Sequence, residues 1–566
     1  MIRRIFKKRG RVNMSKDIDP DEIFMDSQNL PQFDIDQMEG RIEKTVSRKT
    51  ITFLSFIFIF FFLFLSYKIF TLQVLSGEEF REISENNRLR HSVIFAARGN
   101  ILDRNGELLA WNEPQSENQD FPKRVYSEKD GFANLIGYIK YPQQDAKGFY
   151  YEFDYKGIDG VEQIFDDSLS GENGRTIVET NALGDMISEN TIFNSKQGES
   201  INLSIDSGVQ ENLYSSIKSV ADDVGFNGGG GIIMSIHTGE VLAMATYPEL
   251  DSQKLTDGDK EYLSAVNSDP RNPFLNRITQ GLYTPGSIVK PFMALAVLNE
   301  GVIDEYTNIV STGKLEVPNP YNPSNPTFFS DWKAHGAVDV RHALAVSSNI
   351  YFYVVGGGHN DIEGLGITRL EKYMRSFGFG KAVEGDISSP LSGTIPSPEW
   401  KAENFDGDIW RLGDTYFTSI GQYGFQVTPI QVVRSIAMIA NEGKILNPKL
   451  IKDSKPEVDM EVENISRETY KIVKEGMRLS VLEGTAKGLN LSEVEIAGKT
   501  GTAELGVSKD NVNSWTVGFF PYQNPQYAFA IFMEKGSRKN LIGGVAVTRR
   551  LFDWMKVHTP EYFGIE

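Results

Sequence analysis

Cysteine is absent from the 566 residues of this sequence. That absence excludes disulfides, a cysteine nucleophile and a thiolate zinc site within the chain. Histidine is scarce as well: the 6 histidines are scattered, and none falls in an H-E-x-x-H or similar ligand spacing. We therefore do not expect a dedicated metal site.

An excess of basic residues is also missing. Lys and Arg number 58 against 76 Asp and Glu, so the formal net charge is -18. This balance argues against a nucleic-acid partner, for which a basic face would be expected. The length predicts two or three domains rather than one.

Long hydrophobic runs are lacking too, with one exception at residues 51–67, ITFLSFIFIFFFLFLSY, which 69–72 nearly continue. About 20 apolar residues match the roughly 30 Å hydrocarbon core of a bilayer. Apolar residues cover every face, unlike a helix buried on one side only. No small-residue cleavage site follows, so we predict an uncleaved signal-anchor helix at 51–72.

The charges around this run predict an orientation. Many Lys and Arg residues precede it, including those at positions 3, 4, 7–9 and 48–49. By the positive-inside rule, residues 1–50 form a cytoplasmic tail, and the rest of the chain lies outside the bacterial inner membrane.

Beyond the anchor, the pattern predicts two regions and a short end. Residues 73–205 contain short apolar runs between glycine turns, which is typical of a small β-rich module. Residues 206–558 mix helices and strands and form one large domain, with two strands around a turn at Thr238-Gly239 and another strand at 494–504. Residues 559–566 are expected to be a C-terminal tail.

A candidate nucleophile lies at the start of an apolar helix in GLYTPGSIVKPFMALAVLN. Ser287 and Lys290 are three residues apart, so their side chains share a helix face. A lysine can activate a serine hydroxyl if burial or a second cation lowers its pKa. Pro291 has no N–H, so we expect the carbonyl of Ser287 to lose its usual helix partner and the helix to be irregular at this point.

The same spacing occurs three more times, at 215/218, 311/314 and 330/333, and we interpret those as ordinary surface pairs. Two later motifs favour Ser287: S-S-N at 347–349 and the single K-T-G, at 499–501. The ordered set S-x-x-K, S-x-N and K-T-G is the signature of penicillin-binding proteins and class A β-lactamases.

With these motifs, the chain resembles the class B penicillin-binding proteins over residues 50–557. Further matching segments are RGNILDRNGELLA, GVEQIFDDSLSGENG, TGEVLAMATYPELD, SIGQYGFQVTPIQ and AGKTGTAE. HGAVDVRHALAVSSNIYFY is most similar to the elongation (rod-system) type. The resemblance implies an α+β fold: a β-lactamase/transpeptidase-like domain, with an antiparallel sheet flanked by helices and a helical subdomain, on a β-rich dimerisation pedestal with a shortened head.

The resemblance also implies roles for individual residues. Ser287 is the nucleophile, Lys290 its base, Ser347 a proton relay, Asn349 a partner of Lys290 or of the substrate, and Lys499 a carboxylate-binding cation. The implied substrate-binding residues are Ser348, Thr500, Gly501 and Thr502, and the oxyanion hole consists of the N–H groups of Ser287 and Thr502. No cofactor and no metal is implied. Some members have a cysteine, proposed as a metal ligand, at the position occupied here by Asp331.

The implied activity is peptidoglycan D,D-transpeptidation on stem peptides ending in D-Ala-D-Ala, with β-lactams as covalent inhibitors. A polytopic glycosyltransferase is the implied partner, although the short head leaves the contact surface open. The alternatives are a D,D-carboxypeptidase, a β-lactamase, and a penicillin-binding sensor or scaffold. A role in elongation or in division also stays open. One departure is Gly421-Gln422-Tyr423, where the family usually has G-Q-G, so this loop is expected to take a different path.

Overall fold

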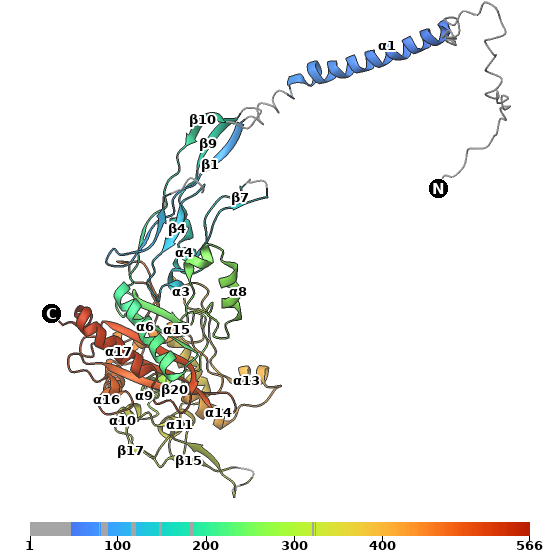
Figure 1. Cartoon of the computed structure of the whole chain (residues 1–566). Coiled ribbons are helices and arrows are strands. Elements are labelled where there is room, and N and C mark those ends of the chain that lie inside the picture. The colour runs from blue at the N-terminus through green and yellow to red at the C-terminus, as the bar shows by residue number, and fades with distance from the viewer. Residues whose placement is uncertain are drawn as a thin grey trace, which may run out of the picture. The chain divides into compact units, whose positions relative to one another are not determined.

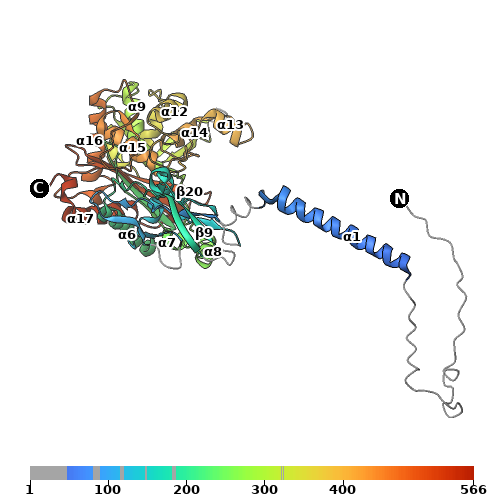
Figure 2. The ribbon, with the colours of Figure 1, turned by 90° about the horizontal axis from the view of Figure 1, so that it is seen from above.

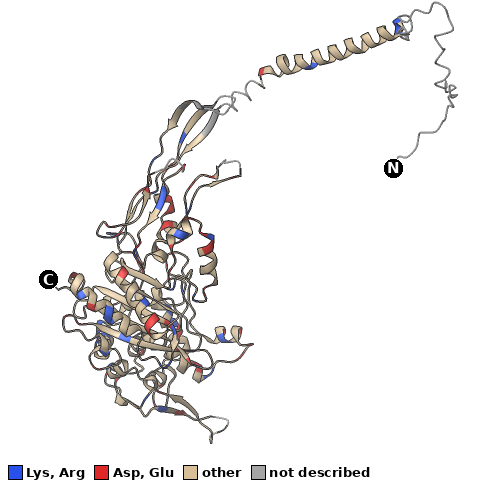
Figure 3. Cartoon of the chain, viewed as in Figure 1, with Lys and Arg blue, Asp and Glu red and all other residues tan. Residues whose placement is uncertain are grey.

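The structure is a computed structural model that describes residues 47–78, 80, 89–114, 120–146, 150–180, 186–319, 322 and 324–565. It divides into two compact units, residues 1–88 and 89–566. Most of the predicted cytoplasmic tail lies outside the described residues. In the second unit, acidic and basic residues are interspersed along the chain (Figure 3).

The described part of the first unit is helical. Helix α1 (Arg48–Phe70) begins at Ser47, whose hydroxyl accepts the N–H of Thr50, and it continues as the π-helical turn η3 (Thr71–Leu75). Within the described residues this is the single helix long and apolar enough to cross a membrane, with 28 residues from Arg48 to Leu75. The predicted span at 51–72 lies inside it.

Residues 89–205, here called the pedestal, are rich in short strands. One sheet has the order β1-β9-β10 and another the order β11-β2-β3-β4, and two strand pairs are β5-β8 and β6-β7. The strands are β1 (Leu89–Ile94), β2 (Ile101–Leu102), β3 (Leu108–Glu113), β4 (Lys123–Tyr126), β5 (Ile139–Lys140), β6 (Gln143–Gln144), β7 (Tyr150–Glu152), β8 (Lys156–Gly157), β9 (Gly174–Thr180), β10 (Met186–Phe193) and β11 (Ile201–Asn202). The helices are α3 (Ala133–Ile136), α4 (Gly160–Ile164) and α5 (Asp166–Ser170).

An ion network that is buried except at Asp166 joins segments of the pedestal. The carboxylate of Glu162 lies between two guanidinium groups, 2.5 Å from Nε of Arg98 and 2.8 Å from Nε of Arg124. Arg98 also reaches Asp166 at 2.7 Å, and Arg124 donates to the carbonyl of Gly99. These contacts tie residues 98–99, just before β2, to β4, α4 and α5.

The large domain is built on a five-stranded antiparallel sheet of order β13-β12-β22-β21-β20 (Figure 1). Its strands are β12 (Gly228–Ser235), β13 (Val241–Tyr247), β20 (Ala497–Leu505), β21 (Asn511–Phe520) and β22 (Tyr527–Ser537). Every residue of β13 is buried, which explains its continuous apolar run, because helices cover both faces of the sheet. The predicted strand pair around Thr238-Gly239 and the strand near 494–504 are confirmed.

The covering helices differ between the two faces (Figure 2). Helices α6 (Ser207–Val224) and α17 (Gly544–His558) pack together on one face, and α15 (Pro429–Asn441) packs on the other. Helix α16 (Arg467–Leu482) contacts both α9 (Lys290–Asn299) and β20. The α+β fold with a helical subdomain is therefore confirmed.

The remaining elements of the large domain surround this framework. They are α7 (Ser252–Thr256), α8 (Lys260–Ser268), η4 (Gly286–Val289), β14 (Ile309–Ser311), β15 (Lys314–Val317), β16 (Thr327–Ser330), β17 (Gly336–Val338), α10 (Val340–Val346), α11 (Asn349–Gly357), α12 (Ile367–Ser376), α13 (Pro398–Asn404), α14 (Leu412–Ser419), β18 (Lys444–Leu446), β19 (Val458–Glu461), η5 (Lys487–Leu489) and η6 (Pro560–Phe563).

The end of the chain is packed rather than loose. Phe563 is buried against Phe520 and Phe552, and the hydroxyl of Tyr562 donates to Asp206 at 2.7 Å. Asp206 is also the N-cap of α6, where the chain leaves the pedestal. Tyr562 and Phe563, which were expected to lie in a C-terminal tail, instead pack on the large domain and contact the start of α6.

Candidate active site

Ser287 lies on a tight turn rather than in the first turn of an α-helix. Residues 286–289 form the 3-10 turn η4, and α9 begins at Lys290. The N–H of Lys290 bonds the carbonyl of Ser287 and takes the place of the usual helix partner that Pro291 cannot supply, so the expected irregularity at the nucleophile is a 3-10 turn. A 3-10 turn has about three residues per turn, which aligns Ser287 with Lys290.

Glycine is required just before the nucleophile. Gly286 has φ +57, and a Cβ atom there would lie 2.9 Å from the carbonyl oxygen of Thr502. Gly501 is equally confined, because its Cβ would lie 2.8 Å from a methyl of Ile288. The turn that carries Ser287 therefore packs directly against strand β20.

Lys290 joins the first motif to the second. Its Nζ donates to the carbonyl of Ser347 at 2.8 Å, to the hydroxyl of Ser347 at 3.3 Å and to Oδ1 of Asn349 at 2.7 Å. Within the described part of the chain, the hydroxyl of Ser287 makes no hydrogen bond, although its side chain is partly accessible. The two motifs that the sequence separates by about 60 residues thus form one contact network.

Burial changes the acid–base character of both lysines. Lys290 is fully buried, and burial lowers its pKa to about 7, although the charge of Asp331 acts in the opposite direction. The ring of Phe352 lies 5.5 Å from its Nζ. Burial and the nearby charge of Lys290 hold the pKa of Lys499 well below its ordinary value. A lysine with a pKa near 7 is a competent general base at neutral pH.

Ser347 lies between two helices in a strained conformation. It is the C-cap of α10, with φ 57 and ψ 41. The left-handed region costs a non-glycine residue about 1–2 kcal/mol, and such strain tends to cluster at functional sites. Lys499 Nζ donates to the Ser347 hydroxyl at 2.8 Å, so this hydroxyl lies between two lysine amines.

Ser348, predicted to bind substrate, has a different role. Its side chain is fully buried, and its hydroxyl caps α11 by accepting the N–H of Tyr351 while donating to Asp331 at 2.8 Å. A hydroxyl engaged on both sides within the protein is not available to a substrate. We therefore assign Ser348 to holding the turn.

The K-T-G motif lies on β20, which is an edge strand of the sheet. An edge strand leaves alternate backbone N–H and C=O groups unpaired. Lys499 Nζ also donates to the carbonyl of Thr500 at 2.9 Å, while the hydroxyl of Thr500 contacts that of Thr485 at 2.6 Å. The sequence did not single out Thr485, and its G-T-A context carried no signal on its own.

The loop at Gly421 contacts the turn that carries the nucleophile. The carbonyl of Gly421 accepts the N–H of Gly286 at 2.9 Å. Tyr423, which stands where the family usually has glycine, has φ 61, and its ring lies 5.9 Å from the ring of Trp400 and 5.7 Å from that of Trp410. Aromatic packing thus holds this non-glycine residue in a left-handed conformation.

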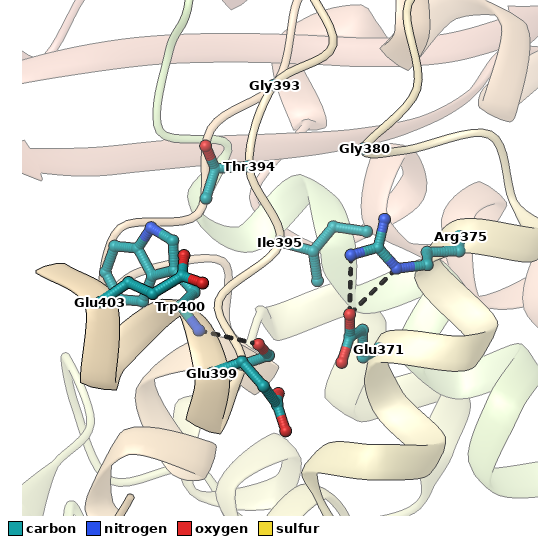
Figure 4. A pocket seen from close by; sticks show the side chains of 10 residues that line it. Glu371, Arg375, Gly380, Gly393, Thr394, Ile395, Glu399, Trp400 and Glu403 are labelled. Carbon is teal, nitrogen blue, oxygen red and sulfur yellow. Dashed lines mark hydrogen bonds and ion pairs between the residues drawn. The ribbon is translucent and has the colours of Figure 1, made fainter. Parts of the chain in front are cut away.

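A cavity of about 360 Å³ lies beside this loop (Figure 4). Trp400, Glu399 and Glu403 from α13 line it, and Arg375 forms a salt bridge with Glu371 at 2.7 Å. None of the three motifs contributes a residue to its lining. The cavity is therefore separate from the reactive centre.

The other Ser/Lys pairs differ in their surroundings. Ser215 and Lys218 are exposed, as are the residues of the 330/333 pair, as expected for surface pairs. Ser311 is different: it is 1% exposed and donates to Asp331 at 3.1 Å. Its interpretation as a surface residue is wrong, and the hydroxyl belongs to the packing beneath the S-S-N turn.

Known proteins match both parts of the second unit. Residues 229–552 match the family model described as the penicillin binding protein transpeptidase domain, and residues 117–203 match that of the penicillin-binding protein dimerisation domain. Among curated relatives, the peptidoglycan D,D-transpeptidase MrdA of Acinetobacter baumannii is 28% identical over 93% of this chain and 89% of its own length.

Solved structures agree. PBP2 of Pseudomonas aeruginosa, in complex with WCK 5153, is 30% identical with a TM-score of 0.68, covering 82% of this chain and 97% of that one. PBP2 of Helicobacter pylori, solved with MreC, shares the fold at 24% identity and a TM-score of 0.69, covering 83% of this chain and 99% of that one. With its transpeptidase and dimerisation domains and the S-x-x-K, S-x-N and K-T-G residues brought together, the chain belongs to the class B penicillin-binding proteins of the rod system.

Proposed function

We propose that this protein is a peptidoglycan D,D-transpeptidase that cross-links stem peptides through an acyl-enzyme on Ser287. The observation that carries the proposal is the network around Ser347, in which Lys290 and Lys499 both donate to one hydroxyl. Such an arrangement can take a proton from a nucleophile and return it to a leaving group. No step of this reaction requires a cofactor.

In acylation, neutral Lys290 removes the proton of Ser287 as its Oγ bonds to the carbonyl carbon of the penultimate D-Ala. The backbone N–H groups of Ser287 and Thr502 stabilise the oxyanion, which is usually the largest electrostatic contribution. The close packing of the 286–289 turn on β20 supports this pairing. The C–N bond then breaks, and Ser347 delivers the proton to the departing D-Ala amine.

In deacylation, the amine of a second stem peptide attacks the ester carbonyl carbon. The new amide bond forms as the bond from that carbon to Ser287 Oγ breaks, and the proton of the amine passes through the same groups back to Ser287 Oγ. We assign Thr500, Gly501 and Thr502 to binding the donor peptide, with Lys499 supplying positive charge for its terminal carboxylate. Lys499 is fully buried, and its Nζ donates to the Ser347 hydroxyl and to the Thr500 carbonyl. Its charge therefore acts on the carboxylate from behind the strand, without a direct contact to an exposed ammonium. Asn349 holds Lys290 in place.

Labelled penicillin tests the nucleophile. The full-length protein in detergent should acquire label on the peptide that contains Ser287, and Ser287→Ala should abolish it. Ser215→Ala is the matched control, because this serine has the same spacing to a lysine but is exposed on α6. Label on another peptide, or label that survives in Ser287→Ala, refutes the proposal.

The acceptor distinguishes the alternatives. A stem-peptide thioester supplied with a D-amino acid should give the exchanged amide faster than the hydrolysed acid. Predominant hydrolysis would instead identify a D,D-carboxypeptidase. Rapid turnover of penicillin would identify a β-lactamase. Stable binding of penicillin without turnover of the thioester would favour the sensor or scaffold alternative.

For location, we propose a single-pass protein of the bacterial inner membrane with its N-terminus in the cytoplasm. The helix from Arg48 to Leu75 and the basic residues before it support this orientation. Because the chain has no cysteine, single cysteines introduced at positions 40 and 260 give a direct test with a membrane-impermeant maleimide. Labelling at position 40 in intact spheroplasts would contradict the orientation.

We further propose a polytopic glycosyltransferase as the partner, since the two matched domains leave glycan polymerisation to another protein. The Helicobacter pylori relative was solved with MreC, so a scaffold of that kind is a second candidate. Crosslinking from pedestal positions in cells, followed by identification of the product, tests both. The nature of the product distinguishes an integral membrane enzyme from a scaffold.

A further inference from the structure

Asp331 forms an unusually complete set of contacts directly beneath the S-S-N turn. Its Oδ2 accepts four hydrogen bonds: from the hydroxyls of Ser348 at 2.8 Å and Ser311 at 3.1 Å, and from the N–H groups of Asn349 at 2.9 Å and Ile350 at 3.1 Å. Its Oδ1 accepts the N–H of the next residue, Trp332, at 2.9 Å. The side chain is fully buried.

Three of these donors, Ser348, Asn349 and Ile350, come from the start of α11, where backbone N–H groups lack helical partners and the helix dipole favours negative charge. Burial alone would raise the pKa of the Asp331 carboxyl. The N–H groups of Asn349 and Ile350, together with the Ser348 hydroxyl and the charge of Lys290, outweigh burial, so the pKa lies below its ordinary value. The residue is therefore an anion at the pH of growth.

The chain places this anion close to the reactive groups without exposing it to substrate. Asn349 donates its backbone N–H to Asp331 and accepts Lys290 Nζ on its side chain at 2.7 Å. The charged groups around Lys290 are Asp331 and Lys499, and His335 lies 3.7 Å from the Asp331 carboxylate. Asp331 thus affects Lys290 in two ways. Its hydrogen bonds hold the turn whose Asn349 contacts Lys290, and its negative charge attracts the Lys290 amine when that amine is protonated.

We propose that Asp331 is a positioning residue, whose carboxylate fixes the Ser347–Asn349 turn and thereby holds Lys290 in its reactive arrangement. This inference rests on the proposed acylation of Ser287. Asp331 touches no reacting atom, and its effect passes through Asn349 and Lys290.

The contacts also decide between this role and metal binding at the same position. The surrounding groups point hydrogen atoms at the carboxylate, which leaves Oδ2 saturated by donors. Within the described residues, no cluster of three or more His, Cys, Asp or Glu side chains could hold a metal ion. The residues present fit an anionic helix cap and do not fit a metal.

The test measures acylation of the full-length protein by fluorescent penicillin over a range of concentration and pH. Concentration series separate the initial affinity from the limiting rate of acylation. Asp331→Asn removes the charge and keeps the shape, and Asp331→Glu keeps the charge but displaces it. Asp206→Asn is the matched control, because Asp206 is likewise a buried aspartate that accepts an N–H at the start of a helix, here as the N-cap of α6, away from the three motifs.

For Asp331→Asn, the limiting rate should fall by about tenfold or more, as expected for the loss of charge-assisted hydrogen bonds, with initial affinity unchanged. Its pH midpoint should move lower, because the attraction that favours charged Lys290 is gone. Asp331→Glu should lower the limiting rate and keep the midpoint. Asp206→Asn should lower the melting temperature and leave both kinetic quantities at wild-type values.

The inference is overturned if Asp331→Asn loses only thermal stability, as Asp206→Asn is expected to do. If Asp331→Asn does not fold, Ser311→Ala decides, since it removes one buried donor and keeps the carboxylate. A lower limiting rate with unchanged affinity supports the positioning role, and a wild-type rate refutes it. Absence of label on wild-type Ser287 is a separate result that refutes the proposed function itself.

Discussion

A pH titration of the acylation rate tests the central chemistry of the site. Lys290 must be neutral to accept the proton of Ser287, and burial lowers its pKa to about 7. The acylation rate should therefore rise with pH and level off above the pKa, with a midpoint near 7. The rate rises with pH because only deprotonated Lys290 can accept the proton of Ser287, so acid removes activity.

The magnitude follows from the fraction of neutral lysine. With a pKa of about 7, the neutral fraction is about one tenth at pH 6 and about nine tenths at pH 8, so the rate should rise about tenfold between them. An ordinary lysine, with a pKa of about 10.4, would be less than about one part in a thousand neutral at pH 7. With such a lysine as the base, the acylation rate would still rise about tenfold per pH unit at pH 9.

The assay is the limiting rate of labelling by fluorescent penicillin in quenched samples, with thermal melting followed at each pH to exclude unfolding. Lys290→Met should remove the pH-dependent component together with most of the rate. A wild-type profile without a step between about pH 6 and pH 8, or one that rises without a plateau to pH 9, would refute the assignment of a neutral buried lysine as the base.

Three further changes test the geometry. Gly286→Ala should lower the free energy of unfolding by about 1–3 kcal/mol and slow acylation, because its φ is +57 and its Cβ would lie 2.9 Å from the Thr502 carbonyl; wild-type melting and labelling would contradict this packing. Asn349→Asp puts a carboxylate where Oδ1 lies 2.7 Å from Lys290 Nζ, so the acylation midpoint should rise by about one to three pH units; an unmoved midpoint would show that this contact does not govern the base. Glu162→Gln leaves two buried arginines without their shared counter-ion and should cost about 3–5 kcal/mol in denaturant unfolding; a change near zero would mean that water or another carboxylate replaces it.

Much of the site could be predicted from the sequence because its chemistry depends on residue types at fixed short spacings. The structure brings the predicted S-x-x-K, S-x-N and K-T-G residues together: Lys499 bonds the same serine hydroxyl as Lys290. The β12–β13 pair could be anticipated from two strand-like segments around the turn at Thr238-Gly239, and the antiparallel sheet from the family resemblance. These features are local or follow from a known combination of motifs.

Other features depend on contacts between segments that no spacing connects. Asp331 gathers donors from Ser311 and from the start of α11, and neither segment shows an aspartate-binding pattern by itself. Thr485 reaches the K-T-G strand from the loop after α16. The 3-10 turn at 286–289 was also missed, because Pro291 marks an irregular helix without specifying which bond replaces the lost one.

The open edge of β20 has a consequence for how a substrate is selected. A peptide that extends along this edge could become a sixth strand of the sheet, matched through its main chain rather than through its side chains. The residues that precede a D-Ala-D-Ala end could then vary widely without loss of strand register. An enzyme that binds each donor peptide as an added strand would tolerate changes in the composition of the stem peptide. A rigid molecule that mimics the backbone of that strand would compete for the same edge of β20.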